Sequence, residues 1–218
     1  MTHTWITKTS ECKLILFFNG LGMDENTLCG FNNAGYDVCM FYNYNELTSL
    51  KESFDEYDEI YVVAWSMGVW VAEQVLKISE LRITKSVAIN GTLLPISSEF
   101  GIAKNIFKGT AKNWDERNRK KFFMRMFASK NLFEKYNNSL PKRDTAEQKE
   151  ELLFLAEEAS KCNRLGFNWD MAFCGEQDLI FSYKNQINHW QNRTEVISLN
   201  MPHFPFGMMK CWDEILKW

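Results

Sequence analysis

Short apolar runs alternate along the chain with longer segments in which apolar residues recur at the spacing of a helix. The apolar runs span residues 13–20, 36–44, 59–66, 83–91, 169–178 and 194–203. Strands that are apolar on both faces and are joined by helical crossovers are typical of a parallel sheet covered by helices on both sides. The pattern therefore predicts an α/β fold with a mainly parallel sheet.

The segments between these runs carry the helical pattern, and one of them is much longer than the rest. We expect helices at residues 23–34, 46–56, 67–79, 180–191 and 206–216. Between residues 97 and 165 no strand pattern occurs, and the stretches "NIFKGTAKNWDERNRKKFFMRMF" and "TAEQKEELLFLAEEASKC" are typical of amphipathic helices. We therefore expect one domain, residues 1–218, in which residues 97–165 form a helical cap inserted after the fourth apolar run.

Composition and charge narrow the class of protein. The 218 residues are 45% hydrophobic and 24% charged, as in a globular protein, and the formal net charge is −3, which offers no basic field for nucleic acid. No apolar stretch reaches the roughly 18 residues of a membrane span, and no export signal pattern opens the sequence. We expect a cytoplasmic protein whose six scattered cysteines are reduced, with no metal site and no cofactor.

The first candidate catalytic motif is "AWSMG", which joins the third apolar run to the helix that follows it. A serine at such a junction, with small residues two positions before and after it, is typical of a nucleophile elbow. Here the small residues are Ala64 and Gly68, and glycine is usual at both places. Ser66 is therefore the candidate nucleophile. The alternative is an ordinary strand-to-helix connection in which the serine caps the helix.

A serine nucleophile needs a base, and the chain has three histidines. His3 lies in a terminus that we expect to be frayed, and His189 lies inside a helical pattern. His203 follows the last apolar run in "LNMPHFPFG", the position after serine and acid at which an α/β-hydrolase places its base. We therefore expect His203 to be the base.

The third member of a triad is a carboxylate that orients the imidazole. "CGEQDLI" follows the fifth apolar run and offers Asp178, with Glu176 as the competing carboxylate. We prefer Asp178, because a residue at the end of such a turn can reach the next loop. Its alternative role is to cap a helix that begins near Leu179.

An oxyanion hole needs two backbone amides. One is expected from Met67, directly after the nucleophile, and the other from the loop after the first apolar run, "FNGLGMDE". Gly20 and Gly22 flank Leu21 there and allow the backbone a tight turn, so we assign the Leu21 amide as the second donor. A glycine turn that only precedes a helix is the alternative.

Four blocks together resemble the BioG-type pimeloyl-acyl carrier protein methyl ester esterases of biotin synthesis: "FFNGLGMDE", "AWSMGVWVAEQVL", "AINGTLLPISSEFGIAKNIFKGT" and "ERNRKKFFMRMF". The resemblance covers nearly the whole chain in the same order. It implies an α/β-hydrolase fold, a triad of Ser66, Asp178 and His203, and hydrolysis of the methyl ester of a seven-carbon acyl chain carried as a thioester by acyl carrier protein (ACP). Trp65 also matches the "GWS-x-G" elbow of related BioH-type enzymes, while Ala64 departs from it.

Residues 97–165 hold 15 Lys/Arg and 10 Asp/Glu, a formal charge of +5 on an otherwise acidic chain. Most such runs are solvated surface. With acidic ACP as the implied partner, a set of cations in "ERNRKKFFMR" becomes a candidate docking surface, although two of its arginines could instead pair with Asp115 or Glu116. These candidates are Arg117, Arg119, Lys120, Lys121 and Arg125.

Three hypotheses on function therefore stand. The first is the methyl ester esterase acting on ACP. The second is a broad small-molecule carboxylesterase or thioesterase that uses the same triad, and it would have no need of a basic cap. The third is a non-catalytic ACP-binding module.

Overall fold

The computed structural model describes residues 1–50, 54–79, 81–161 and 166–218. These residues form a seven-stranded sheet in the order β1-β3-β2-β4-β5-β6-β7. β1 runs antiparallel to β3, and every other neighbouring pair is parallel. The strands are β1 (Thr2–Thr7), β2 (Lys13–Phe18), β3 (Asp37–Tyr42), β4 (Glu59–Trp65), β5 (Lys85–Ile89), β6 (Met171–Gly175) and β7 (Glu195–Leu199).

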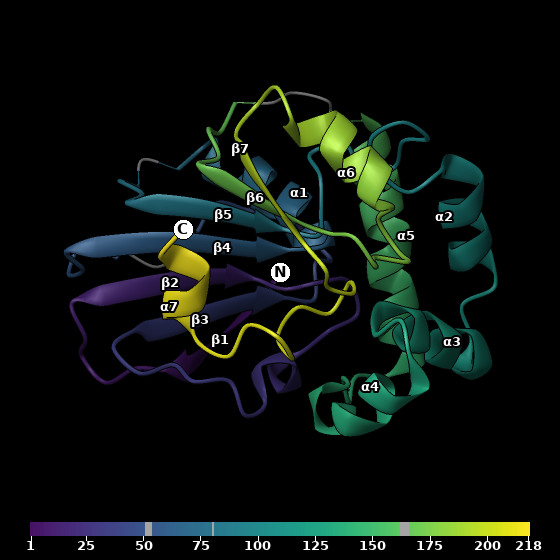
Figure 1. Ribbon diagram of the computed structural model, residues 1–218, viewed down its shortest axis with the longest axis horizontal. Coiled ribbons are helices and arrows are strands. Elements are labelled where there is room, and N and C mark those ends of the chain that lie inside the picture. The colour runs from purple at the N-terminus through teal and green to yellow at the C-terminus, as the bar shows by residue number, and fades with distance from the viewer. Residues whose placement is uncertain (51–53, 80, 162–165) are drawn as a thin grey trace.

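Both faces of the sheet are buried, as the continuous apolar strands predict. In β2, Leu14 and Leu16 belong to one apolar cluster, and Ile15 and Phe17 belong to the cluster on the opposite face. Helices α1 (Met67–Leu76) and α6 (Tyr183–Trp190) contribute to the first cluster, and α7 (Trp212–Leu216) contributes to the second. The predicted mainly parallel sheet with helices on both faces is therefore present (Figure 1).

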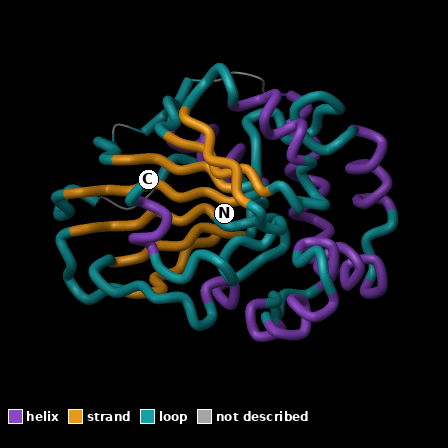
Figure 2. Tube along the Cα trace, viewed as in Figure 1, coloured by secondary structure: helices purple, strands orange, loops and turns teal. Residues whose placement is uncertain are grey.

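Between β5 and β6 the chain leaves the sheet and forms helices. We call this segment the insertion; it comprises α2 (Lys104–Lys112), α3 (Glu116–Met126), α4 (Lys130–Lys135), the short 3-10 helix η2 (Asn137–Ser139) and α5 (Thr145–Lys161). These helices gather at one end of the sheet (Figures 1 and 2). No helix in the described part of the chain is long and apolar enough to cross a membrane.

Three predicted helices differ from the structure. Residues 23–34 form only the 3-10 helix η1 (Glu25–Leu28), because turn-forming Asn and Gly residues follow it at once. The prediction for 46–56 is wrong over 46–50 and 54–56, which form no helix, and residues 51–53 lie outside the described part. The helix predicted at 206–216 begins only at Trp212, since "FPFG" favours turns before it.

The N-terminal segment is a strand and not a frayed terminus. Residues Thr2–Thr7 form β1, which adds an antiparallel edge to the sheet, and His3 pairs with Phe41 in the ladder. The prediction of fraying was wrong because a half-exposed edge strand carries few apolar residues, so its pattern does not stand out from that of a loop.

Candidate active site

Ser66 sits on a sharp turn between β4 and α1. Its backbone has φ 60° and ψ −129°, a region that a non-glycine residue rarely occupies and that carries strain. A Cβ at Gly68 would lie 2.3 Å from the Phe18 carbonyl oxygen, and one at Gly91 would lie 2.2 Å from the Ser66 carbonyl oxygen. The turn therefore depends on bare backbone around it, as a nucleophile elbow does. Ala64 is fully buried in β4, where its methyl fits without glycine.

His203 faces the serine from the loop after β7. Its Nε2 lies 2.9 Å from the Ser66 Oγ, and the ring is fully buried. Two side chains fix the backbone of this loop: the Trp65 indole donates to the His203 carbonyl at 2.8 Å, and the Asn90 amide donates to the carbonyls of Pro202 and His203 at 2.9 and 3.0 Å. The imidazole is thus held within hydrogen-bond reach of the hydroxyl proton.

Asp178 completes the line of hydrogen bonds. Its Oδ2 lies 2.8 Å from His203 Nδ1 and also accepts from Gln186 Nε2 at 3.1 Å, while its Oδ1 accepts from the amides of Ile180 and Phe181 at 2.7 and 2.9 Å. Four donors surround this side chain, which has no exposed surface, and they fix its orientation. The structure thus brings the three predicted residues together in the geometry of a Ser-His-Asp triad.

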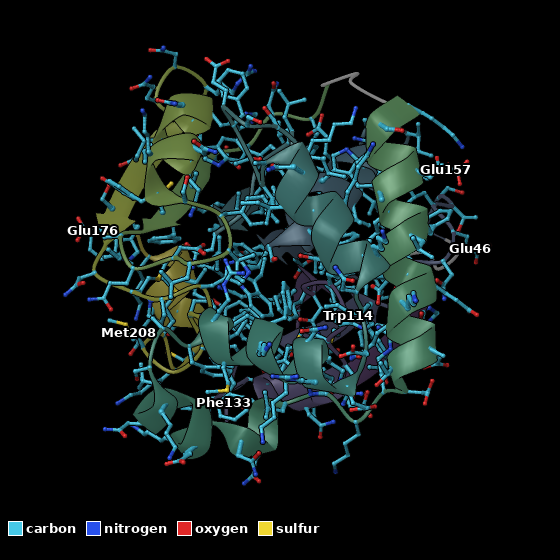
Figure 3. The ribbon with its side chains drawn as sticks, turned by 90° about the vertical axis from the view of Figure 1, so that its right-hand side faces the viewer. Glu46, Trp114, Phe133, Glu157, Glu176 and Met208 are labelled. Atoms are coloured by element: carbon cyan, nitrogen blue, oxygen red, sulfur yellow. The ribbon has the colours of Figure 1, made fainter. Side chains whose placement is uncertain are left out.

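The competing candidates lie elsewhere. Glu176 is exposed, makes no hydrogen bond to His203, and stands at the edge of the molecule in Figure 3. α6 is capped by Ser182, so the alternative role of Asp178 as the cap of a helix near Leu179 does not apply. His189 is buried in α6, where its Nε2 accepts from the Leu93 amide at 3.3 Å, and burial lowers its pKa to about 4.

The candidate oxyanion donors flank the serine. Met67 is the first residue of α1, so its amide precedes the helix's own hydrogen-bond ladder. Leu21 lies in the turn after β2, and within the described residues its amide donates to no protein acceptor. Both residues line the same pocket as Ser66. The two amides therefore lie in residues that line the pocket beside Ser66.

A small pocket of about 30 Å³ opens over Ser66. Its walls come from the loop after β2, from α1, α2, α3 and α5, and from the loop after β6. Most lining side chains are apolar, and Arg125 is the charged member. Besides Ser66, Leu21, Met67 and Arg125, the lining consists of Ile102, Ile106, Phe107, Thr110, Phe122, Leu152, Ile180 and Phe181.

The five candidate docking cations have different surroundings. Arg119 is held inside the insertion, where its guanidinium lies 2.6 Å from Thr145 Oγ1 and 3.4 Å from Glu116 Oε1. Arg125 donates from the pocket wall to the Leu179 carbonyl at 2.8 Å. The remaining three are exposed on α3 and make no ion pair in the described part of the chain; they are Arg117, Lys120 and Lys121.

Sequence reasoning missed two residues that support the triad. Asn90, directly after β5, also accepts from the Gly175 amide at 2.8 Å and so joins the loops after β5, β6 and β7. Gln186 in α6 donates to Asp178. The sequence indicated these two residues only weakly: Asn90 is a polar residue at the end of an apolar strand, and Gln186 is a polar residue on the core face of a helix.

Cysteines and metal ligands have no part in this site. Cys12, Cys29, Cys174 and Cys211 are free thiols, and Cys162 lies outside the described residues. Over the described ranges, no group of three or more His, Cys, Asp or Glu side chains could hold a metal ion.

Comparison with known proteins gives consistent matches. A family model described as pimeloyl-ACP methyl esterase BioG matches residues 1–215. A malonyl-[acyl-carrier protein] O-methyltransferase of Bacteroides fragilis is 41% identical over 177 residues, which are 81% of this chain and 36% of that protein. The chain thus spans about a third of the length of this curated relative.

Solved structures extend the comparison to the fold. The crystal structure of BioG from Haemophilus influenzae is 33% identical, covers 99% of both chains and superposes with a TM-score of 0.92. A lipase-esterase related protein from Clostridium acetobutylicum is 14% identical with a TM-score of 0.65, over 95% of this chain and 93% of that one. The second likeness concerns the fold alone, and together they confirm the predicted α/β-hydrolase fold.

Proposed function

The chain belongs to the BioG family of pimeloyl-ACP methyl esterases, and from this premise we propose that it hydrolyses the methyl ester of pimeloyl-ACP to pimeloyl-ACP and methanol. The observation that carries the proposal is the line from Ser66 through His203 to Asp178, with heavy-atom distances of 2.9 and 2.8 Å, at the floor of an apolar pocket. The reaction belongs to biotin synthesis in this family.

The proposed mechanism follows from the positions of these groups. His203 takes the Ser66 proton as Oγ attacks the ester carbonyl, and the amides of Leu21 and Met67 stabilise the negative oxygen of the tetrahedral intermediate. His203 then gives the proton to the departing methoxide, so methanol leaves and an acyl-serine ester remains. Water, activated by the same imidazole, cleaves that ester and restores the serine. Asp178 stabilises the imidazolium during both steps.

The pocket suits a long acyl chain better than a polar substrate. Its lining is mostly Ile, Leu and Phe, which favour burial of methylene groups. A second groove of about 350 Å³ shares Ile106, Thr110, Phe122 and Arg125 with the pocket and continues toward the exposed face of α3. We place the phosphopantetheine arm along this groove, with Lys121 in its wall near the arm's phosphate.

The carrier protein is part of the proposal. Arg117, Lys120 and Lys121 are exposed on α3 without ion-pair partners in the described residues, which supports their role in meeting an acidic surface. Arg119 contributes to the insertion's own packing instead, and Arg125 serves the pocket wall. The relative named for methyl transfer to malonyl-ACP supports the substrate class, because a methyl ester must be made before it is hydrolysed. The insertion acts as the cap of this site, and a cytoplasmic location belongs to the same proposal.

The test compares two esters at equal concentration. Purified protein is incubated with pimeloyl-ACP methyl ester and with free dimethyl pimelate, and methanol release is measured. We expect kcat/KM to be at least about 10-fold higher for the carrier-bound ester, because the rim cations act on encounter. Ser66→Ala should lower turnover of both esters by about 10⁴-fold or more while the protein stays folded.

Other outcomes would assign other functions. Equal kcat/KM on both esters would indicate a broad carboxylesterase, and release of the carrier thiol instead of methanol would indicate a thioesterase. A fluorophosphonate probe that fails to label Ser66 in the wild-type protein would indicate a non-catalytic ACP-binding module.

A further inference from the structure

The turn after β2 presents the candidate donor Leu21. The carbonyl of Gly20 accepts from the Met23 amide at 3.2 Å, and Gly22 has φ 72° at the position where a type II turn requires glycine. We call residues 20–23 the oxyanion loop. In a trans peptide the carbonyl of Gly20 and the amide N–H of Leu21 point in opposite directions, so fixing the turn also aims this N–H.

Two side chains from the insertion bind the oxyanion loop at a single residue. Gln148 Nε2 donates to the Gly22 carbonyl at 2.6 Å, and Glu151 Oε2 accepts from the Gly22 amide at 3.2 Å. Both side chains lie on the same face of α5, three residues apart, and both are fully buried. The peptide groups on either side of Gly22 are therefore held from α5, more than 120 residues away in sequence.

Glu151 is part of a larger buried network. Its Oε1 accepts from the Tyr44 amide at 3.2 Å, and its Oε2 lies 2.6 Å from Arg143 Nη1. Arg143 in turn donates to Asn43 Oδ1 at 2.7 Å and to the Met23 carbonyl at 3.3 Å. Burial raises the pKa of the Glu151 carboxyl, and the arginine and the backbone amides oppose that effect.

A buried ion pair of this kind contributes little to stability, because removing both charges from water costs about as much as their attraction returns. Apolar side chains of similar volume would join α5 to the sheet at least as well. The network does offer direction, since the bonds from Gln148 and Glu151 constrain the peptide groups on either side of Gly22, directly after the pocket-lining Leu21.

We propose that Gln148 and Glu151 are positioning residues of the oxyanion hole. From α5 they hold the peptide groups around Gly22, so that the Leu21 amide points at the oxygen that becomes negative during attack by Ser66. This inference rests on the proposed ester hydrolysis, and it adds that the insertion helps to build the catalytic centre as well as to cover it.

The experiment measures p-nitrophenyl butyrate hydrolysis by Gln148→Met and Glu151→Gln, with Glu150→Gln as the matched control. Methionine keeps the volume of Gln148 without its donor, and Glu150 is exposed on the same helix. Loss of one oxyanion donor lowers kcat by about 10²–10³. For a misaligned donor we expect kcat to fall about 10–100-fold while KM stays within about 3-fold of the wild-type value. A trifluoromethyl ketone adds to Ser66 and mimics the tetrahedral intermediate. Its inhibition constant should therefore rise in parallel with the fall in kcat/KM.

Three results would overturn the proposal. The first is a kcat of Gln148→Met within 2-fold of the wild-type value, and the second is an equal loss of kcat in the control Glu150→Gln. The third is a loss of kcat that equals the loss in the fraction of protein molecules whose Ser66 reacts with a fluorophosphonate. The last would mean that the two residues only keep the protein folded. Wild-type turnover of p-nitrophenyl butyrate without turnover of the carrier-bound ester would count against the proposed substrate and leave this comparison in force.

Discussion

At the scale of single residues, the strained turn at Ser66 was predictable from local sequence, and the contacts that distant segments supply were not. "AWSMG" identifies Ser66 because the elbow needs small neighbours only two positions away. Asn90, Gln186 and Glu151 act on residues far along the chain, and no local pattern separates them from ordinary polar side chains. The missed residues are therefore the ones whose partners only the fold determines.

The acid can be tested by single substitutions. Asp178→Asn should lower kcat by about 10⁴-fold, as in other triads, because an amide cannot stabilise the imidazolium and presents an N–H to the wrong tautomer of His203. Glu176→Gln is the matched control and should keep nearly full activity, since this carboxylate is exposed and does not reach His203. Activity on p-nitrophenyl butyrate is the measurement, and the reverse ranking would move the acid to Glu176.

At the scale of elements, the predicted strands that fill the sheet centre were correct to within a few residues, because both of their faces are apolar. Helices were less predictable where turn residues follow closely, as in 23–34. α5 shows a subtler limit: Leu152 and Leu155 mark its core face, and Gln148 and Glu151 lie on that same face. Polar residues on a core-facing stripe are a readable signal of a buried network, although not of what the network binds.

α6 gives a prediction about pH. His189 in α6 has its pKa lowered to about 4, chiefly by burial and also by Arg193, whereas an unfolded histidine titrates near 6.5. As pH falls below about 6.5 the unfolded state binds the proton first, so stability decreases until about pH 4, where the folded state binds it too. Above pH 6.5 this group has no effect.

The loss over that interval is up to roughly 2–3 kcal/mol, which corresponds to several degrees of Tm for a chain of this size. His189→Gln keeps an acceptor for the Leu93 amide and does not titrate. Its Tm should therefore fall less than that of the wild type between pH 6.5 and 4, as followed by differential scanning fluorimetry. If Tm falls equally in both proteins between pH 6.5 and 4, His189 is not the group responsible for the loss of stability.

At the scale of the whole molecule, the insertion is hydrogen-bonded to three loops of the candidate site, those after β2, β6 and β7. The Phe204 amide, next to His203, donates to the Met126 carbonyl at the end of α3 at 2.8 Å. Arg125 donates to the Leu179 carbonyl, next to Asp178, and α5 holds the oxyanion loop as described above. The insertion thus helps to hold the loops that carry the candidate triad, in addition to lining the pocket over Ser66.

The exposed face of α3 supplies the prediction at this scale. Lys120→Glu combined with Lys121→Glu should lower kcat/KM for the carrier-bound ester by about 10-fold or more at low salt, and the difference should shrink at high salt. Hydrolysis of p-nitrophenyl butyrate should change little. Arg125 is left intact in this variant, because it lines the pocket.

The matched control carries the same change of charge at a distance from α3, with Lys184→Glu on α6 and Lys210→Glu before α7. It should retain turnover of both esters. Equal losses in the two double variants would show that net charge alone matters, and no loss in either would place the docking surface elsewhere.

The position of the insertion also affects how the chain is made. β5 ("KSVAI") pairs with β4 on one edge, and its other edge pairs with β6, which leaves the ribosome only after segment 90–170 has been synthesised. At about 5–20 residues per second this takes roughly 4–16 s. Throughout that time an apolar central strand has one unpaired edge, which is a template for association with other chains. The segment between β5 and β6 therefore also sets the period of translation during which the nascent protein most needs protection from aggregation.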